Sequence, residues 1–452
     1  MPELYEMTIV EAAEAIRTGG MSPVDLMECL LSRSRDMDSQ LCVWETLDEE
    51  LALDSARACQ LEIERSGPQG ALHGIPIGVK DIFNTKDLRT TSGSPIYENF
   101  VPDFDSTAVG RLRKAGAIVM GKTITTEFAS FDPPSTRNPW NHEHTPGGSS
   151  SGSAVGVAAR LFPAALGSQT SGSVLRPASY NGVIGVKPTF GRISRYGVTP
   201  VAWSLDTIGY FTRSLEDAAL VLEVISGHDK NDPESSREPV YGYTEAVASA
   251  GLAPRIGVVR GFFSNMADDE VSTHTENVVE NLGVAGADIE EAVLISDVDA
   301  LLEAHTVVMN VESAVSREKE FASRPGDFSP NVLGSIESGM SVSGTVYVKA
   351  QQTRASFRRE ITELAGRFDL LLTPSTLTQA PRDLTTTGDP SFQAPWTTAG
   401  LPTISIPSGL TNAGLPLGIQ LAAAPFAEAK LLSSALWCVN SLDVSLGTPT
   451  EL

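Results

Sequence analysis

Residues 145–179 read TPGGSSSGSAVGVAARLFPAALGSQTSGSVLRPAS, and the interpretation of the whole chain starts from this stretch. Serines and glycines gather near its two ends, and a helical pattern, AVGVAARL, and a strand-like run, AALG, lie between them. Glycines let the backbone approach a ligand closely, and small residues leave several N–H groups free to face one point. A flexible serine–glycine linker would not carry so many apolar side chains. We therefore interpret the stretch as a catalytic or ligand-binding loop.

Short apolar runs alternate with helical patterns on both sides of this stretch. The strand-like runs lie at 73–81, 116–123, 164–170, 182–189, 255–259, 369–375, 403–410 and 414–423. Helical patterns at 106–116 and 152–161 separate the first of them. The alternation predicts an α/β fold: a single large domain with a mixed, mostly buried sheet and helices on both faces.

The residue patterns divide this one domain into four stretches. Residues 1–65 are predicted to be N-terminal helices, 66–226 the core, 227–365 a variable helix-rich region that begins with a surface connection at 227–254, and 366–452 a return to the sheet. Ser22 and Pro23 have the residue types of a helix cap and a first helical turn.

Composition narrows the class of protein. A formal charge of −23 argues against nucleic acid as a partner, because phosphate binding needs a basic surface. No apolar run is long enough to span a membrane, and the acidic start does not resemble a signal peptide, so we expect a cytoplasmic protein without a membrane partner. Four cysteines without CxxC spacing predict buried free thiols and no metal site.

These segments, in their order along the chain, resemble the amidase signature family. The matching segments are GIPIGVKD at 74–81, TTSGS at 90–94, GKTITTEFA at 121–129, GGSSSGS at 147–153, TSGS at 170–173, KPT at 187–189, GRISRYGVTPVAWSLDTIG at 191–209, TTAGLPTISIPSGL at 397–410 and GLPLGIQL at 414–421. The resemblance spans most of the chain and is weakest over 230–365. It implies the amidase signature fold and amide hydrolysis without a cofactor.

The resemblance also implies a Ser–cis-Ser–Lys triad made of Ser173, Ser149 and Lys80. Ser173 would be the nucleophile, and Ser149, which follows a cis peptide, would relay its proton to Lys80. Lys80 must then be uncharged, and burial among apolar neighbours lowers the pKa of a lysine in that direction. Asp81 would oppose this effect, but alternate residues of a strand point to opposite faces, so we expect Asp81 to face away.

The oxyanion hole is expected at the backbone N–H groups of four residues, Thr170, Ser171, Gly172 and Ser173. Further contacts with the substrate are predicted for Gly147, Gly148 and Ser150. Ser171 and Ser151 stand where the family usually has glycine, so a left-handed backbone at position 171 would be strained.

Arg176 lies three residues after Ser173, and the segment SVLRPA looks like the malonamidase type. There the arginine holds a substrate carboxylate, a role that suits a guanidinium group. A structural ion pair beneath the site is the alternative, and both interpretations stay open at this point.

Other patterns are given less weight. Residues 116–123 match the phosphate-loop pattern GxxxxGK[ST], but the apolar residues lie inside the would-be loop, so nucleotide binding is only an alternative. His142 and His144 lack a third metal ligand, and a Ser-His-Asp triad that uses one of them is left open. Glu127 and Asp206 are interpreted as hydrogen-bonding groups.

The sequence thus predicts an amidohydrolase for small amides, with carbamates or esters as further substrates, on a malonamidase- or urethanase-like branch. The expected partner is a small-molecule amide or carbamate, and a homodimer is left open. The alternative within the family is the transamidating subunit that acts on mischarged tRNA, which the charge disfavours. An inactive homologue is disfavoured by Lys80, Ser149 and Ser173.

Overall fold

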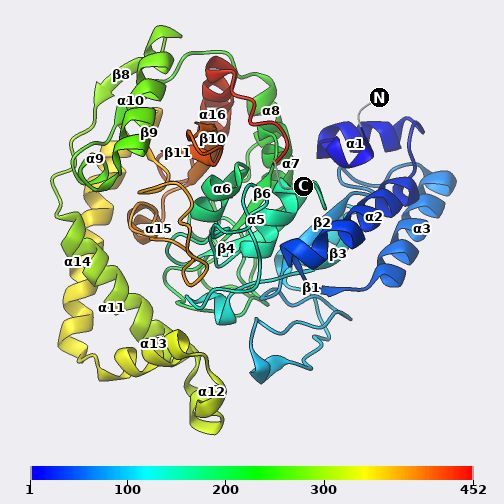
Figure 1. Cartoon of the computed structure of the whole chain (residues 1–452), viewed down its shortest axis with the longest axis horizontal. Coiled ribbons are helices and arrows are strands. Elements are labelled where there is room, and N and C mark those ends of the chain that lie inside the picture. Colours follow the sequence, from blue (N-terminus) through cyan, green and yellow to red (C-terminus); the bar gives the residue numbers. More distant parts are fainter. Residues whose placement is uncertain (1–2, 450–452) are drawn as a thin grey trace.

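The computed structural model describes residues 3–449 and is built on one mixed sheet of 11 strands (Figure 1). In sheet order the strands are β1 (Trp44–Leu47), β3 (Ile118–Thr123), β2 (Pro76–Lys80), β4 (Ala164–Gln169), β6 (Thr207–Thr212), β5 (Ile184–Lys187), β10 (Thr403–Leu410), β11 (Pro416–Ala422), β9 (Leu370–Pro374), β7 (Arg255–Val258) and β8 (Asp288–Glu291). Neighbours are parallel in β3–β2–β4 and in β9–β7–β8, and antiparallel elsewhere.

Helices surround this sheet (Figure 1). They are α1 (Ile9–Arg17), α2 (Pro23–Leu41), α3 (Glu49–Ser66), α4 (Thr107–Lys114), α5 (Ser151–Ala158), α6 (Leu175–Asn181), α7 (Leu215–Ile225), α8 (Tyr243–Ala248), α9 (Phe262–Met266), α10 (Asp269–Val284), α11 (Val298–Ser316), α12 (Glu318–Ser323), α13 (Pro330–Ser341), α14 (Gly344–Ala365), α15 (Ala394–Ala399) and α16 (Glu428–Leu442), with 3-10 turns η1 (Leu4–Glu6), η2 (Pro95–Tyr97), η3 (Glu127–Ala129) and η4 (Pro325–Asp327). Among the described residues, no helix combines the length and apolar character needed to cross a membrane.

Two successive residues of β6 show that helices cover both faces of the sheet. A Cβ atom on Gly209 would lie 3.0 Å from Val174, at the start of α6. The hydroxyl of the next residue, Tyr210, donates to the carbonyl of Ala218 in α7 at 2.7 Å. Because side chains alternate along a strand, α6 and α7 lie on opposite faces. The predicted single α/β domain with a covered mixed sheet is confirmed.

The predicted strands all form, and so does the predicted start of α2. Ser22 caps this helix by accepting the N–H of Asp25 at 3.0 Å, and Pro23 occupies the first turn. Of the four free cysteines only Cys438 is buried, so the prediction of four buried thiols was wrong for the other three.

Three strands were missed by the sequence analysis: β1, β6 and β8. β1 interrupts the N-terminal stretch that was expected to be helical, and α8 lies in the expected surface connection. The division of the domain into four stretches stays a prediction.

The phosphate-loop-like pattern at 116–123 is mostly taken up by β3, so no loop exists there to surround a phosphate. Lys122, its lysine, is fully buried and lies 3.1 Å from the carboxylate of Asp81, which is also fully buried. Lys122 further donates to the carbonyl of Phe83 and the hydroxyl of Thr90, at 2.9 and 2.6 Å. This lysine therefore has a structural role between β2 and β3.

Replacing Lys122 by methionine should lower the free energy of unfolding by about 3–5 kcal/mol, because Asp81 would keep a buried charge without its partner. Urea denaturation measures this loss. Arg17→Ala, which breaks the exposed ion pair with Glu14, should leave the free energy of unfolding nearly unchanged and serves as control. Equal losses in the two variants would contradict the structural role of Lys122.

Candidate active site

Lys80, the last residue of β2, has its side chain entirely inside the protein. Its Nζ lies 2.8 Å from the hydroxyl of Ser149 and 2.9 Å from that of Ser168, on β4. Burial lowers the pKa of Lys80 to about 7, and only the charge of Asp206 acts in the opposite direction. A neutral amine is therefore well populated at neutral pH, as the chemistry of a general base requires.

Asp81 does face away from Lys80, as the alternation of the strand predicts. Its carboxylate accepts the backbone N–H and the hydroxyl of Thr91 at 2.8 and 2.6 Å, and it pairs with Lys122. Asp81 therefore balances the charge of Lys122 and not that of Lys80, its neighbour in the sequence.

The loop that carries Ser149 precedes α5, and the peptide bond between Gly148 and Ser149 is cis. The guanidinium of Arg176 donates to the carbonyl of Gly148 at 2.8 Å, which ties the loop to α6. On its other side, the hydroxyl of Ser150 lies 3.3 Å from both the N–H and the carbonyl of Ser168. These contacts hold Ser149 between β4 and α6.

Ser173 lies in the turn that joins β4 to α6, and it lines a narrow cavity. The residue is 8% exposed, and Thr170, Ser171 and Arg176 line the same cavity. The backbone N–H groups of Ser171, Gly172 and Ser173 donate no hydrogen bond to any residue that the structure describes. Unpaired N–H groups beside a hydroxyl are what an oxyanion hole requires.

Gln169, at the end of β4, fixes this turn, and the sequence analysis missed it. Its side-chain carbonyl accepts the N–H groups of Val174 and Leu175 at 2.8 and 3.0 Å. Its amide nitrogen donates to the hydroxyl of Thr397 at 2.9 Å, and that hydroxyl donates to the carbonyl of Ser171 at 2.7 Å. A polar side chain in a buried strand was the available signal, but its partner in α15 lies 228 residues away.

Ser171 and Ser151 replace glycine without strain, because neither residue has a left-handed backbone. The hydroxyl of Ser151 donates to the carbonyl of Gly147 at 2.7 Å. The hydroxyl of Ser171 lies 2.7 Å from Nε2 of His305, on α11. His305 is a second residue near the site that the sequence analysis did not single out.

Arg176 lines the same cavity as Ser173 and is buried. Beyond its contacts with Gly148 and Thr387, its Nε and Nη1 atoms have no hydrogen-bond partner. No carboxylate among residues 3–449 forms an ion pair with it, so the structural ion pair considered above is absent from this part of the chain. A buried cation without a counter-ion is costly, and an anionic ligand would lower that cost.

The other predicted site residues lie outside this cavity. Gly147, Gly148 and Ser150 are buried beside it, and their contact with a substrate stays a prediction. His144 is bonded to the carbonyl of Ala380 at 2.6 Å. No group of three or more potential metal ligands occurs among the described residues.

Two acidic residues near the site have hydrogen-bonding roles, as predicted. Asp206 accepts the hydroxyl of Thr170 at 2.6 Å, together with the backbone N–H of Val201. Glu127 accepts the hydroxyl of Ser94 at 2.6 Å.

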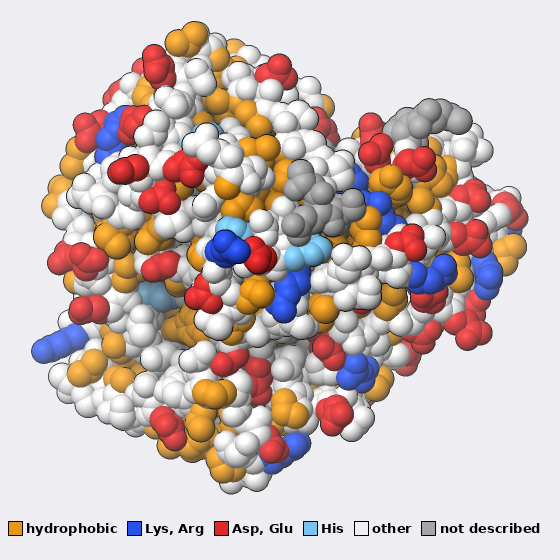
Figure 2. All heavy atoms as spheres, in the orientation of Figure 1, with side chains coloured by type: hydrophobic (Ala, Val, Ile, Leu, Met, Phe, Trp, Pro, Cys, Tyr) orange, Lys and Arg blue, Asp and Glu red, His pale blue; other side chains and the backbone are white. Residues whose placement is uncertain are grey.

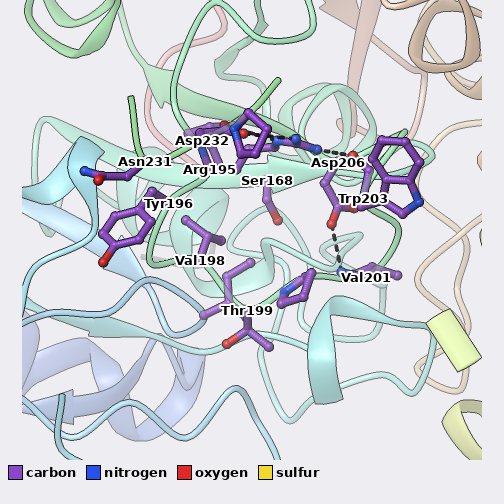
Figure 3. Close-up of a pocket in the computed structure, with 14 residues that line it drawn as sticks. Ser168, Arg195, Tyr196, Val198, Thr199, Val201, Trp203, Asp206, Asn231 and Asp232 are labelled. Atoms are coloured by element: carbon purple, nitrogen blue, oxygen red, sulfur yellow. Dashed lines mark hydrogen bonds and ion pairs between the residues drawn. The ribbon is translucent and has the colours of Figure 1, made fainter. Parts of the chain in front are cut away.

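A second and larger cavity lies beside Ser168 (Figure 3). Its wall is mainly apolar, and the exposed rings of Tyr196 and Trp203 lie on either side of Ser168 in the figure. Val201 lines this cavity and the one beside Ser173. One of the two hydroxyls that bind Lys80 therefore faces the second cavity.

Known proteins resemble this chain over most of its length. The family described as Amidase matches residues 25–432. A glutamyl-tRNA(Gln) amidotransferase subunit of Geobacter sp. (strain M21) is 35% identical over 472 residues, covering 96% of each chain. The native peptide amidase of Stenotrophomonas maltophilia is 28% identical, with a TM-score of 0.85 and 99% of each chain covered.

A third similar protein comes from a vestigial protein complex that reveals the evolutionary origins of an s-triazine catabolic enzyme. It is 29% identical, with a TM-score of 0.90, over 97% of this chain and 99% of that one. None of these three is named as a malonamidase or a urethanase, so they do not support the branch predicted from SVLRPA.

Proposed function

Because the chain belongs to the amidase family, we propose that it hydrolyses the C–N bond of small amides through an acyl-enzyme on Ser173. The observation that carries this proposal is the buried Lys80, which is bonded to two hydroxyls and to no carboxylate of residues 3–449. A neutral amine in that position is suited to accept a proton at neutral pH.

In the first half of the reaction, Ser173 Oγ bonds to the substrate carbonyl carbon while its proton passes through Ser149 to Lys80. The negative charge on the carbonyl oxygen is stabilised by the N–H groups of Ser171, Gly172 and Ser173, which are unpaired within the described chain. The proton then returns from Lys80 through Ser149 to the leaving nitrogen, and the C–N bond breaks.

In the second half, water takes the place of the amine. Its oxygen bonds to the acyl carbon and its proton passes through Ser149 to Lys80. When the bond to Ser173 Oγ breaks, Lys80 returns a proton to that oxygen through the same serine. The cycle consumes one water and needs no cofactor.

We further propose that the preferred substrate carries a carboxylate that binds Arg176, on a malonamidase-like branch of the family. The support is the buried guanidinium, which lines the cavity and has two nitrogen atoms without a partner. A carboxylate oxygen is a charged acceptor to which such an unpaired N–H group can donate. Carbamates and esters have the same carbonyl geometry and are further candidates.

A second candidate is the role of an amidotransferase component, which the 35% identity to such a protein favours. The net charge of −23 favours hydrolysis of small molecules instead, because tRNA binding needs a basic surface. On the face in Figure 2, acidic side chains are spread among scattered basic ones. If the chain alone does not hydrolyse amides and does so once partner subunits and tRNA are added, the amidotransferase role is correct.

Ser173→Ala should lower turnover of any amide substrate by about 1,000-fold or more, because no other group forms the acyl-enzyme. The assay uses a panel of small amides, dicarboxylate monoamides, anilides and carbamates. Ser433→Ala, on the surface of α16, is the matched control and should keep full activity. Unchanged turnover in Ser173→Ala would exclude the proposed nucleophile.

The value of kcat/KM for a neutral amide should rise with pH through an apparent pKa of about 7. Below that pH Lys80 carries a proton and cannot accept another, and above it the amine is free. A pH–rate profile of the wild type measures this. Lys80→Met should abolish turnover, whereas Lys430→Met, at an exposed lysine, should leave the profile unchanged. A flat profile between about pH 5 and 9 would contradict this role of Lys80.

Arg176→Met should raise KM for dicarboxylate monoamides by about 30-fold or more and leave KM for neutral amides within about threefold, since only the acidic substrates lose a charged partner. Arg176→Lys keeps the charge and should lose less. Arg176 also holds Gly148. A fall in kcat that is equal for acidic and neutral substrates would therefore assign it a positioning role only.

A further inference from the structure

Ser171 begins a chain of three hydrogen-bonded side chains that leads away from the cavity of Ser173. Its Oγ lies 2.7 Å from Nε2 of His305, and Nδ1 of His305 lies 2.7 Å from the hydroxyl of Thr398, on α15. All three residues are buried, and Ser171 lines the cavity next to the nucleophile. This chain has no part in the proposed mechanism.

The direction of each hydrogen bond follows from the far end of the chain. The hydroxyl of Thr398 lies 2.7 Å from the carbonyl of Ala394, and a carbonyl can only accept. Thr398 therefore donates its single proton there and accepts the N–H of Nδ1 from His305. A neutral imidazole has one N–H, so Nε2 is an acceptor and the hydroxyl of Ser171 donates to it.

His305 stays neutral in this position. Burial, and to a smaller extent the charge of Arg354, lower the pKa of His305 to about 3. The ring therefore cannot take the proton of Ser171 at neutral pH, and Ser171 is not a second nucleophile. The same neutrality fixes the donor and acceptor roles over the whole working pH range.

We propose that Ser171 Oγ is a hydrogen-bond acceptor that selects substrates by the group next to the reacting carbonyl carbon on its acyl side. The selected substrates have an N–H group in that place. The proton of Ser171 is committed to His305, so only oxygen lone pairs are available to the cavity. The other neighbour of this oxygen, the sulfur of Met309 at 3.5 Å, is a weak acceptor and does not compete for the lone pairs.

The position of the selected N–H follows from the backbone. The N–H of Ser171 belongs to the proposed oxyanion hole, so its side chain lies close to the atoms attached to the carbonyl carbon. An N–H group in that place can donate a hydrogen bond to Ser171 Oγ, whereas a methylene cannot. An ether oxygen there would put a second acceptor against Ser171 Oγ. Together with Arg176, this favours ureido acids over simple dicarboxylate monoamides. The inference rests on the proposed function for the position of the carbonyl.

Binding of isosteric pairs tests the subsite without any turnover. N-carbamoylglycine and succinamate differ by N–H against CH2, as do N-carbamoyl-β-alanine and glutaramate. Their dissociation constants are measured by calorimetry on Ser173→Ala and on Ser173→Ala/Ser171→Ala. We expect the preference for the ureido member to fall by about tenfold when Ser171 is replaced, which is the effect of one hydrogen bond to a buried acceptor.

His274→Gln in the same background is the control, because His274 bonds Ser408 away from the cavity, and it should leave the preference unchanged. An unchanged preference in the Ser171→Ala protein would overturn the inference, as would failure of all four compounds to bind. Nitrogen-15 NMR of His305 tests the direction of the chain in the unmodified protein. Nδ1 should carry the proton from about pH 5 to 9, and a proton on Nε2 would overturn the acceptor role.

These outcomes are separate from those for the proposed function. Binding and tautomer are measured without the nucleophile or without substrate, so they do not depend on whether Ser173 forms an acyl-enzyme. Loss of amide turnover in Ser173→Ala, with no change of preference on Ser171→Ala, would uphold the reaction and reject the subsite.

Discussion

The amino group of Lys80 is enclosed by protein, and the groups that bind it are the hydroxyls of Ser149 and Ser168. A charged amine in such a place loses the solvation of water, and hydroxyls do not replace it as a carboxylate would. The proton affinity therefore falls until the neutral form is common near pH 7. Asp206, whose charge acts in the opposite direction, is itself bonded to Thr170 and to backbone N–H groups. The arrangement of the site follows from the need to keep this amine uncharged.

The sheet order brings the parts of the site together. β2 pairs in parallel with β4, which places Lys80 next to Ser168, and the turn after β4 carries Ser173. The Ser149 loop is joined to α6 by the bond from Arg176 to Gly148 and to β4 by the bond from Ser150 to Ser168. Gln169 also fixes the turn, because its side-chain carbonyl accepts the N–H groups of Val174 and Leu175 at the start of α6. β2, the Ser149 loop and the turn between β4 and α6 are thus joined by hydrogen bonds.

The sequence could predict the strands that are continuous apolar runs, such as β2 and β3, because burial on both faces leaves that pattern. It could not predict β8, where three of four residues are acidic and the strand lies at the edge of the sheet. β6 was missed although it lies near the centre of the sheet and follows a turn at 203–205. The nearness of Ser149 to Lys80 came from the family resemblance. The contact of Ser171 with His305 spans 134 residues and leaves no local pattern.

Two buried lysines on neighbouring strands differ in whether a carboxylate pairs with them. Lys80 and Lys122 are both fully buried, and β2 and β3 pair in register beside them. Burial lowers the pKa of Lys122 as well, but the carboxylate of Asp81 opposes it there. Asp81 follows Lys80 directly, and strand alternation turns it to the face of Lys122. Asp81 therefore pairs with the structural lysine, and no carboxylate among residues 3–449 forms an ion pair with Lys80, which favours its neutral form.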